Sequence, residues 1–250
     1  MFFCIPVFSE NIKPFLKQEL LSGYFFARKE TQNIQDDEFS NPGMLWVEKG
    51  SYLWTQQPNK NSKSCYQCHG KAENSMVSVA TSYPRIDIST EKLINIEQRI
   101  VFCQIRHQKI DPYKPESEQL LSLSAYIAKQ SEGLPINVKI KGKAEKWFKK
   151  GKKLYFEKIG QMDLACNQCH NDRVGSYLRA EHISQGHLNG FPAYLLRWGS
   201  LSSPHKRFQF CNQQARAKPL DIFSDDYNAL QLYVTWRGNG LPMESPSVRR

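Results

Sequence analysis

A chain of 250 residues has room for one large domain or two of modest size, each able to bury a core. The hydrophobic share is 40%, and no stretch reaches the roughly 18 consecutive apolar residues of a membrane helix, which argues against a membrane-spanning protein. With 34 basic and 24 acidic residues the formal charge is +10, which favours an acidic partner, an anionic surface or a small anionic substrate. No nucleic-acid-binding motif accompanies this charge, so we predict no nucleic-acid partner.

Residues 1–43 are predicted to form an N-terminal extension that lies along the surface. Residues 11–21 have the spacing of a short helix, and a polar stretch follows them. Asn41-Pro-Gly then closes the extension as a turn. The first predicted domain begins after this turn.

Two Cys-x-x-Cys-His pentads, one in each half of the chain, are the strongest chemical signal in the sequence. This pattern is the attachment signature of c-type haem, in which two thiols form thioethers and the histidine binds the iron from one face. A zinc site would need a second thiol or histidine pair about 12 to 20 residues from the first, whereas Cys68 and Cys166 lie 98 positions apart (166 − 68 = 98). The sequence therefore predicts two haems c, held by Cys65, Cys68 and His69 and by Cys166, Cys169 and His170.

The pentads also indicate where the protein works. Haem is attached to such pentads on the outer side of the bacterial cytoplasmic membrane, so we predict a periplasmic protein. Residues 1–8 are apolar but lack the basic region and the small-x-small cleavage site of an export signal. The start of the mature chain is therefore left open, and we assign Cys4 to this end.

The two halves of the chain repeat each other in fixed register. Seven identities recur with a displacement of 101 positions (166 − 65 = 101), where Trp46, Gly50, Leu53, Cys65, Gln67, Cys68 and His69 match Trp147, Gly151, Leu154, Cys166, Gln168, Cys169 and His170. Further on, Tyr126 and the Gly-Leu-Pro motif at 133–135 recur 107 positions later (233 − 126 = 107). Matches in fixed register indicate internal duplication.

Each half predicts the same order of elements. A helix at the tryptophan is followed by a haem loop, an irregular wrap, a cysteine and a terminal helix, at residues 117–130 in the first half and 225–236 in the second. This is the order of a small cytochrome c domain. We therefore predict an all-α protein with two tandem cytochrome c-like domains related by internal duplication, at residues 44–136 and 143–245, the second being catalytic.

One further cysteine follows each pentad in the shared pattern Arg-x-x-Phe-Cys, as Arg99 to Cys103 and as Arg207 to Cys211. The matched positions predict that Cys103 and Cys211 bind iron on the face opposite the histidine. A thiolate ligand stabilises ferric iron and lowers the reduction potential. Two buried thiols, or a disulfide joining the halves, are the alternatives.

The second half carries Arg237 where the first carries Gln130, three positions before the glycine of Gly-Leu-Pro. Arginine presents a rigid fork of donors that suits oxyanions. Since Arg207 lies four residues before Cys211, the second haem has two candidate anion-binding groups. The alternative role for Arg237 is that of a cation favoured by the dipole at a helix C-terminus.

With two upstream pentads, the run Arg207-Phe-Gln-Phe-Cys211-Asn212 and the run Arg237-Gly-Asn-Gly240, the sequence resembles the SoxA family, the dihaem subunits of the SoxAX cytochrome of bacterial thiosulfate oxidation. The resemblance covers nearly everything from Ser22 onward. It implies an L-cysteine S-thiosulfotransferase that joins thiosulfate oxidatively to a cysteine of the carrier protein SoxYZ. It also implies the monohaem cytochrome c SoxX as heterodimer partner and a downstream cytochrome c as electron acceptor.

The resemblance implies a role for each site residue as well. Cys211, as a persulfide, would be both nucleophile and axial ligand of the catalytic haem, and Arg207 and Arg237 would hold thiosulfate. Cys103 would complete the other haem. The alternative function is that of a non-catalytic, low-potential dihaem cytochrome c that only transfers electrons.

Overall fold

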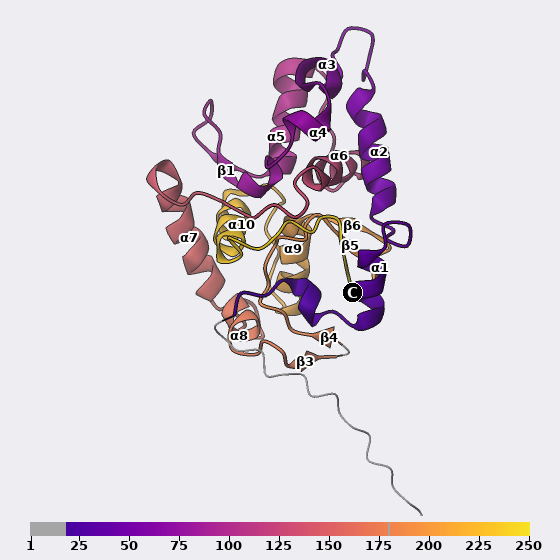
Figure 1. Cartoon of the computed structure of the whole chain (residues 1–250). Helices are drawn as coiled ribbons and strands as arrows, with labels where there is room; N and C mark the ends of the chain where they lie inside the picture. The colour runs from indigo at the N-terminus through magenta and orange to yellow at the C-terminus, as the bar shows by residue number, and fades with distance from the viewer. Residues whose placement is uncertain (1–18, 180) are drawn as a thin grey trace, which may run out of the picture.

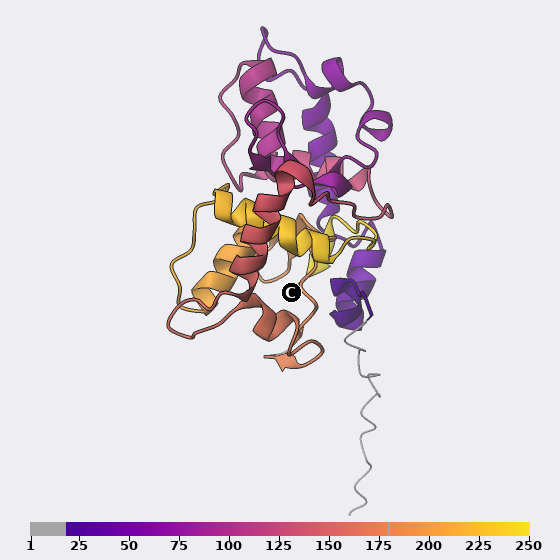
Figure 2. The same cartoon turned by 90° about the vertical axis from the view of Figure 1, so that its left-hand side faces the viewer.

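The computed structural model describes residues 19–179 and 181–250, and in it the chain folds into two helical parts stacked end to end (Figures 1 and 2). The longer helices of the first part are α2 (Met44–Thr55), α5 (Ile96–Cys103) and α6 (Glu118–Lys129). Those of the second part are α7 (Glu145–Phe156), α9 (Pro204–Gln214) and α10 (Asp225–Arg237). The other α-helices described are α1 (Lys29–Asp36), α3 (Cys65–His69), α4 (Ala72–Ser75) and α8 (Cys166–His170).

The predicted terminal helices are confirmed, since α6 and α10 cover residues 117–130 and 225–236 to within a residue or two at each end. The sequence predicts no helix at Cys103 or Cys211, yet both cysteines lie on helices, α5 and α9. Cys4 and most of the helix predicted over residues 11–21 lie outside the described residues, and residues 19–21 are not helical.

Seven short strands accompany the helices in the described part of the chain, and the all-α prediction did not include them. Two hairpins are formed by β1 (Arg85–Ile86) with β2 (Leu93–Ile94) and by β3 (Tyr177–Leu178) with β4 (Glu181–His182). A three-stranded sheet has the order β6-β5-β7, in which β5 (Ala193–Leu195) is antiparallel to β6 (Ser200–Ser202) and parallel to β7 (Ser247–Arg249). None of the helices described is both long and apolar enough to cross a membrane.

A close helix crossing explains the glycine that both halves share. In the first half α2 packs on α6 at Gly50, where an added Cβ would lie 2.2 Å from the backbone oxygen of Ser122 and 2.6 Å from Cβ of Tyr126. In the second half α7 packs on α10 at Gly151, where a Cβ would lie 1.9 Å from the oxygen of Ala229. Only glycine fits at such a distance. The repeat therefore preserves a backbone contact.

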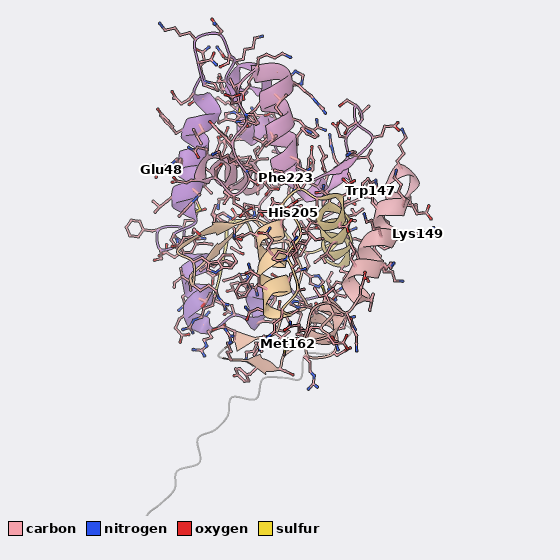
Figure 3. All side chains as sticks on the ribbon, turned by 180° about the vertical axis from the view of Figure 1, so that it is seen from behind. Glu48, Trp147, Lys149, Met162, His205 and Phe223 are labelled. Carbon is pink, nitrogen blue, oxygen red and sulfur yellow. The ribbon has the colours of Figure 1, made fainter. Side chains whose placement is uncertain are left out.

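The exposed and buried faces of α7 follow its sequence. Trp147 is 8% exposed and packs with Ala229 and Leu232 of α10, whereas Lys149 points outward and pairs with Glu145 one turn away (Figure 3). An amphipathic helix of this kind is what the tryptophan spacing predicts.

The two Gly-Leu-Pro motifs pair with each other and so join the halves. The amide of Gly133 donates to the carbonyl of Met243 over 3.0 Å, and the amide of Met243 donates to Leu134 over 2.9 Å. A third bond runs from the amide of Ile136 to the carbonyl of Leu241 over 2.9 Å. The two copies of the Gly-Leu-Pro motif, which mark the repeat in the sequence, therefore lie in contact in the folded protein.

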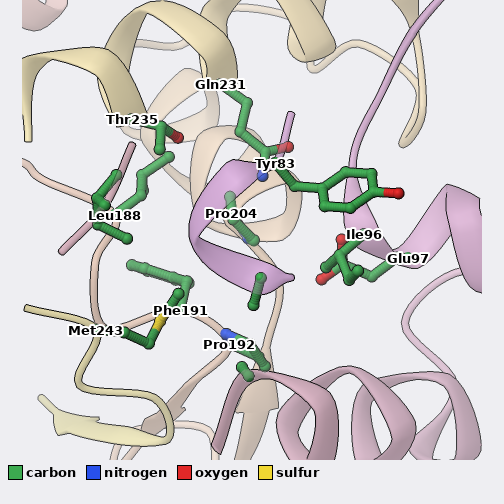
Figure 4. A pocket seen from close by; sticks show the side chains of 13 residues that line it. Tyr83, Ile96, Glu97, Leu188, Phe191, Pro192, Pro204, Gln231, Thr235 and Met243 are labelled. Carbon is green, nitrogen blue, oxygen red and sulfur yellow. The ribbon is translucent and has the colours of Figure 1, made fainter. Parts of the chain in front are cut away.

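A small cavity of about 30 Å³ lies between the halves, close to the buried His205 near the centre of the molecule (Figures 3 and 4). Glu97 of α5 lines it from the first half, and Gln231 and Thr235 of α10 line it from the second. Most of its remaining wall is apolar, so Glu97 is an unusual residue for this place.

The N-terminal extension packs against the second part of the molecule. Ser22 donates to the Glu244 carboxylate over 2.6 Å, and the side chain of Asn41 donates to the carbonyl of Pro246 over 3.0 Å. Helix α1 lies beside β7 near the C-terminus (Figure 1). Residues 19–43 thus contact the C-terminal segment of the chain at both of their ends.

Candidate haem-binding active site

Both pentads form a five-residue helix whose start is fixed by the shared glutamine. The side-chain oxygen of Gln67 accepts from the amide of Ser64 over 2.9 Å, and that of Gln168 accepts from the amide of Ala165 over 2.6 Å. Such a bond satisfies one of the free amides at a helix start. The glutamine inside each Cys-x-Gln-Cys-His run therefore orients the pentad.

A second shared device lies after each pentad. The indole of Trp54 donates to the carbonyl of Gly70 over 2.9 Å, and the hydroxyl of Tyr155 donates to the side-chain oxygen of Asn171 over 2.8 Å. Trp54 and Tyr155 are 101 positions apart (155 − 54 = 101), as are Gly70 and Asn171 (171 − 70 = 101). In both halves an aromatic residue of the helix before the pentad, α2 or α7, thus binds the residue that follows the histidine.

The imidazole of His170 is held in one orientation and one tautomer. Its Nδ1 lies 2.8 Å from the carbonyl oxygen of Ser184, which can only accept, so Nδ1 carries the proton and Nε2 keeps a lone pair. Burial lowers the pKa of His170 to about 4, which keeps the ring neutral. Gly186 has φ +75°, and a Cβ there would lie 2.8 Å from the ring. The loop at residues 184–186 therefore fixes this imidazole.

His69 is held differently. Its ring lies against the Trp54 indole at a centroid distance of 5.8 Å. Burial, and then the charge of His107, lower the pKa of His69. The first pentad histidine is therefore also favoured as a neutral donor.

Each additional cysteine lies beside its pentad. Burial, and then the neighbouring Cys103 thiol, raise the pKa of Cys65 to about 12. Burial, and then Cys211, raise the pKa of Cys166 to about 12 in the same way. The described cysteines are all free, and Cys211 is exposed, so a disulfide between the halves is not formed.

The two arginines of the Arg-x-x-Phe-Cys pattern have opposite environments. Arg99 donates to the Asp87 carboxylate over 2.6 Å and to the hydroxyl of Tyr83 over 3.1 Å. Arg106 binds the same carboxylate. Burial opposes ionisation of Asp87, but the hydrogen bonds that it accepts, led by the one from Arg106, hold its pKa well below the usual range. The positive charge of Arg99 is therefore balanced by the carboxylate of Asp87.

Arg207 has no such carboxylate. Its Nη1 is buried and has no hydrogen-bond partner among the described residues, and its guanidinium carbon lies 5.3 Å from the centre of the Phe210 ring. A buried donor without an acceptor is costly unless a ligand supplies one. The chemistry that would complete this site is an anion beside Cys211.

Comparisons with known proteins show which family the chain is similar to. The SoxA/TsdA cytochrome c domain family model matches residues 49–136. The L-cysteine S-thiosulfotransferase subunit SoxA of Pseudaminobacter salicylatoxidans is 42% identical over 93% of this chain and 82% of its own length, and that of Rhodovulum sulfidophilum is 36% identical over 92% and 80%. The crystal structure of SoxXA from P. pantotrophus has a chain with a TM-score of 0.89 and 36% identity, over 92% of this chain and 87% of that one.

The chain belongs to the SoxA family. Its fold is the helical cytochrome c-like fold of the SoxXA structure. The cytochrome c domain of SoxA proteins implies haem c, and the residues present fit that group. Each pentad brings two thiols and an imidazole together, with a further thiol near them. In the described part of the chain no group of three or more His, Cys, Asp or Glu side chains could hold a bare metal ion.

In this SoxA chain Arg237 lies on the side of His170 and its loop. Its Nη1 donates to the carbonyl of Gln185 over 2.9 Å, and its Nη2 donates to the side-chain oxygen of Asn171 over 2.8 Å. Its guanidinium also lies 4.6 Å from the centre of the Tyr155 ring. The structure thus brings Arg207 near Cys211 and uses Arg237 to brace the loop that holds His170.

Several residues of this candidate site belong to types that do not indicate a haem site in a sequence. Ser184, Gly186 and Asn171 act through a carbonyl, a missing side chain and an amide, none of which is typical of a haem site. Arg197 lies on the turn between β5 and β6, and its guanidinium carbon is 5.4 Å from the Phe210 ring. Only folding brings this turn to α9.

Proposed function

We propose that this SoxA chain is the dihaem catalytic subunit of an L-cysteine S-thiosulfotransferase, with Cys211 as nucleophile and as ligand of the second haem. The observation that carries the proposal is the unneutralised Arg207 beside an exposed Cys211, next to a pentad whose histidine is already oriented. The first half repeats the pattern but neutralises its arginine with Asp87. The chemistry is therefore assigned to the second half.

Thiosulfate is a dianion, and Arg207 offers it charge-assisted hydrogen bonds at the helix position one turn before Cys211. The Cys211 sulfur, as a thiolate or as a persulfide, forms a bond to the terminal sulfur of thiosulfate, and two electrons leave. The carrier cysteine thiolate then attacks, this bond breaks, and the carrier keeps the thiosulfate group. Haem c, held by Cys166, Cys169 and His170, would supply the acceptor for these two electrons. A cysteine nucleophile thus divides one difficult transfer into two steps.

The remaining assignments follow the repeat and the relatives. We assign residues 44–136 and 143–245 to two tandem cytochrome c domains, each with one haem c, and residues 1–43 to an extension. Cys65, Cys68, His69 and Cys103 would hold the first haem, and Cys166, Cys169, His170 and Cys211 the second. The similar SoxXA structure supports SoxX as heterodimer partner. We also propose SoxYZ as carrier, a cytochrome c as downstream acceptor, and a periplasmic location.

The proposal is tested on the haem-loaded complex with SoxX and SoxYZ. We expect wild-type protein and Cys103→Ser to form the thiosulfate adduct on the carrier cysteine, detected by intact mass, and Cys211→Ser to be slower by at least about a thousandfold because its nucleophile is gone. Haem content, measured by absorbance, controls for folding. If Cys211→Ser formed the adduct at the wild-type rate, Cys211 would not be the nucleophile, and the alternative function of a non-catalytic electron-transfer cytochrome would be favoured.

A further inference from the structure

The hairpin of β5 and β6 brings a further arginine to α9, the helix that carries Arg207 and Cys211. Arg197 lies on its turn, where the amides of Trp198 and Gly199 both donate to the carbonyl of Leu195 over 2.9 Å. This turn places Trp198 edge-on to the Phe210 ring at a centroid distance of 5.5 Å. Arg197 is exposed at this position, so an incoming ligand can reach it.

Arg197 and Arg207 approach the same aromatic ring. Their guanidinium carbons lie 5.4 Å and 5.3 Å from the centre of Phe210, which directly precedes Cys211 in the chain. Cation–π contact with the ring offsets part of the repulsion between two like charges. The ring thus holds two forks of hydrogen-bond donors together, and one of them, Arg207, lies one turn before Cys211 on α9.

The positive charge around this ring is not neutralised. Within the described residues neither Arg197 nor Arg207 forms an ion pair. Partial burial, and then Arg207 and Arg179, lower the pKa of Arg197, whereas Glu181 acts in the opposite direction. Glu181 is itself engaged, since it pairs with Arg250 over 3.2 Å and with Arg28 over 3.5 Å. A dianion would relieve the repulsion that remains.

We propose that Arg197 is the second anion-binding residue of the Cys211 site, and that Arg197 and Arg207 together hold the oxygen atoms of a small sulfur oxyanion. This inference rests on the proposed function and deepens it. It adds Arg197 to the anion-binding residues that the family resemblance implies, of which Arg237 donates its hydrogen bonds to Gln185, His170 and Asn171. With the sulfonate oxygens held in this way, the terminal sulfur of thiosulfate is free to face Cys211.

The test compares Arg197→Met and Arg197→Lys with Arg179→Met in the haem-loaded complex. Arg179 belongs to the same group of positive charges, but it contacts Gln214 and has no contact with Phe210, so it controls for general electrostatic attraction. Thiosulfate binding is measured by calorimetry without the carrier, and turnover is measured with it. We expect Arg197→Met to raise both Kd and KM about tenfold or more, with kcat within about twofold, because a charge-assisted contact is lost.

Arg197→Lys should recover part of the affinity, and Arg179→Met should change Kd by less than about twofold. Wild-type affinity in Arg197→Met, while Arg207→Met binds thiosulfate poorly, would overturn the role of Arg197 and leave the proposed function intact. An equal loss of affinity in Arg179→Met and Arg197→Met would also overturn it, because general attraction would then explain the effect. If neither Arg197→Met nor Arg207→Met altered binding or turnover, the proposed function itself would fail.

Discussion

The two halves of the molecule share a scaffold and differ in the electrostatics of one arginine. Gly50 and Gly151 occupy equivalent helix crossings, and Gln67 and Gln168 open equivalent pentads. In the first half the arginine before the cysteine is locked to Asp87, whereas in the second half Arg207 keeps a buried donor free. The two halves therefore hold their pentads in the same way, and one acidic side chain separates an arginine whose charge is paired from one that is open to an anion.

The shared scaffold can be broken symmetrically at its glycines. A Cβ at position 151 would lie 1.9 Å from a backbone oxygen, and one at position 50 would lie 2.2 Å from the equivalent oxygen, so neither helix pair can close around alanine. We expect Gly50→Ala and Gly151→Ala each to lower the free energy of unfolding by at least about 3 kcal/mol, measured by chemical denaturation of the haem-loaded protein. Gly133→Ala is a useful control, because nothing lies within 4 Å of a Cβ there and its cost comes from its φ of +74° alone. A smaller loss at either crossing than at Gly133 would contradict the packing account.

The difference between the halves is tested by exchanging the arginines for methionine. Arg207→Met should lower kcat/KM for thiosulfate about a hundredfold, which corresponds to about 3 kcal/mol, and should leave stability nearly unchanged, because no carboxylate loses a partner. Arg99→Met should do the reverse. It leaves the buried Asp87 with one ion-pair partner, Arg106, in place of two and should cost about 2 kcal/mol of stability with kcat/KM nearly unchanged. Steady-state kinetics measure kcat/KM, and chemical denaturation measures the stability of both variants. Similar losses of kcat/KM in Arg207→Met and Arg99→Met would contradict the assignment of anion binding to the second half alone.

Much of the scaffold could be predicted because its signals are local in sequence. The pentads, the terminal helices and the repeated glycine all follow from spacing along the chain. The electrostatics could not be predicted, because Asp87 reaches Arg99 through the β1–β2 hairpin and Arg197 reaches Phe210 through the β5–β6 hairpin. The same holds for Arg237. Its position at the end of a helix follows from the sequence, but its hydrogen-bond partners Gln185 and Asn171 depend on the fold.

A last comparison concerns the buried titratable group two residues before each arginine. Glu97 of the first half is 2% exposed and His205 of the second is 0% exposed. Burial lowers the pKa of His205 to about 3, so this ring stays neutral in the folded protein. Burial, opposed by a hydrogen bond from Ser124, raises the pKa of Glu97 to about 7, and Glu116 adds to the rise. The two halves therefore bury groups whose ionisation affects stability with opposite dependence on pH.

For Glu97 the direction follows from its raised pKa. Above about pH 4.5 the unfolded chain loses the proton that the folded protein keeps until about pH 7, so stability falls with rising pH across this window. We expect Glu97→Gln to remove about 2 kcal/mol of that fall between pH 5.5 and 7.5, because the amide can line the cavity between the halves without ionising (Figure 4). Denaturation of the haem-loaded protein across this range measures the difference, with the exposed Glu157→Gln as control. A wild-type pH profile in Glu97→Gln would show that the cavity admits enough water to keep the carboxylate solvated, and the pH dependence would then have to come from other groups.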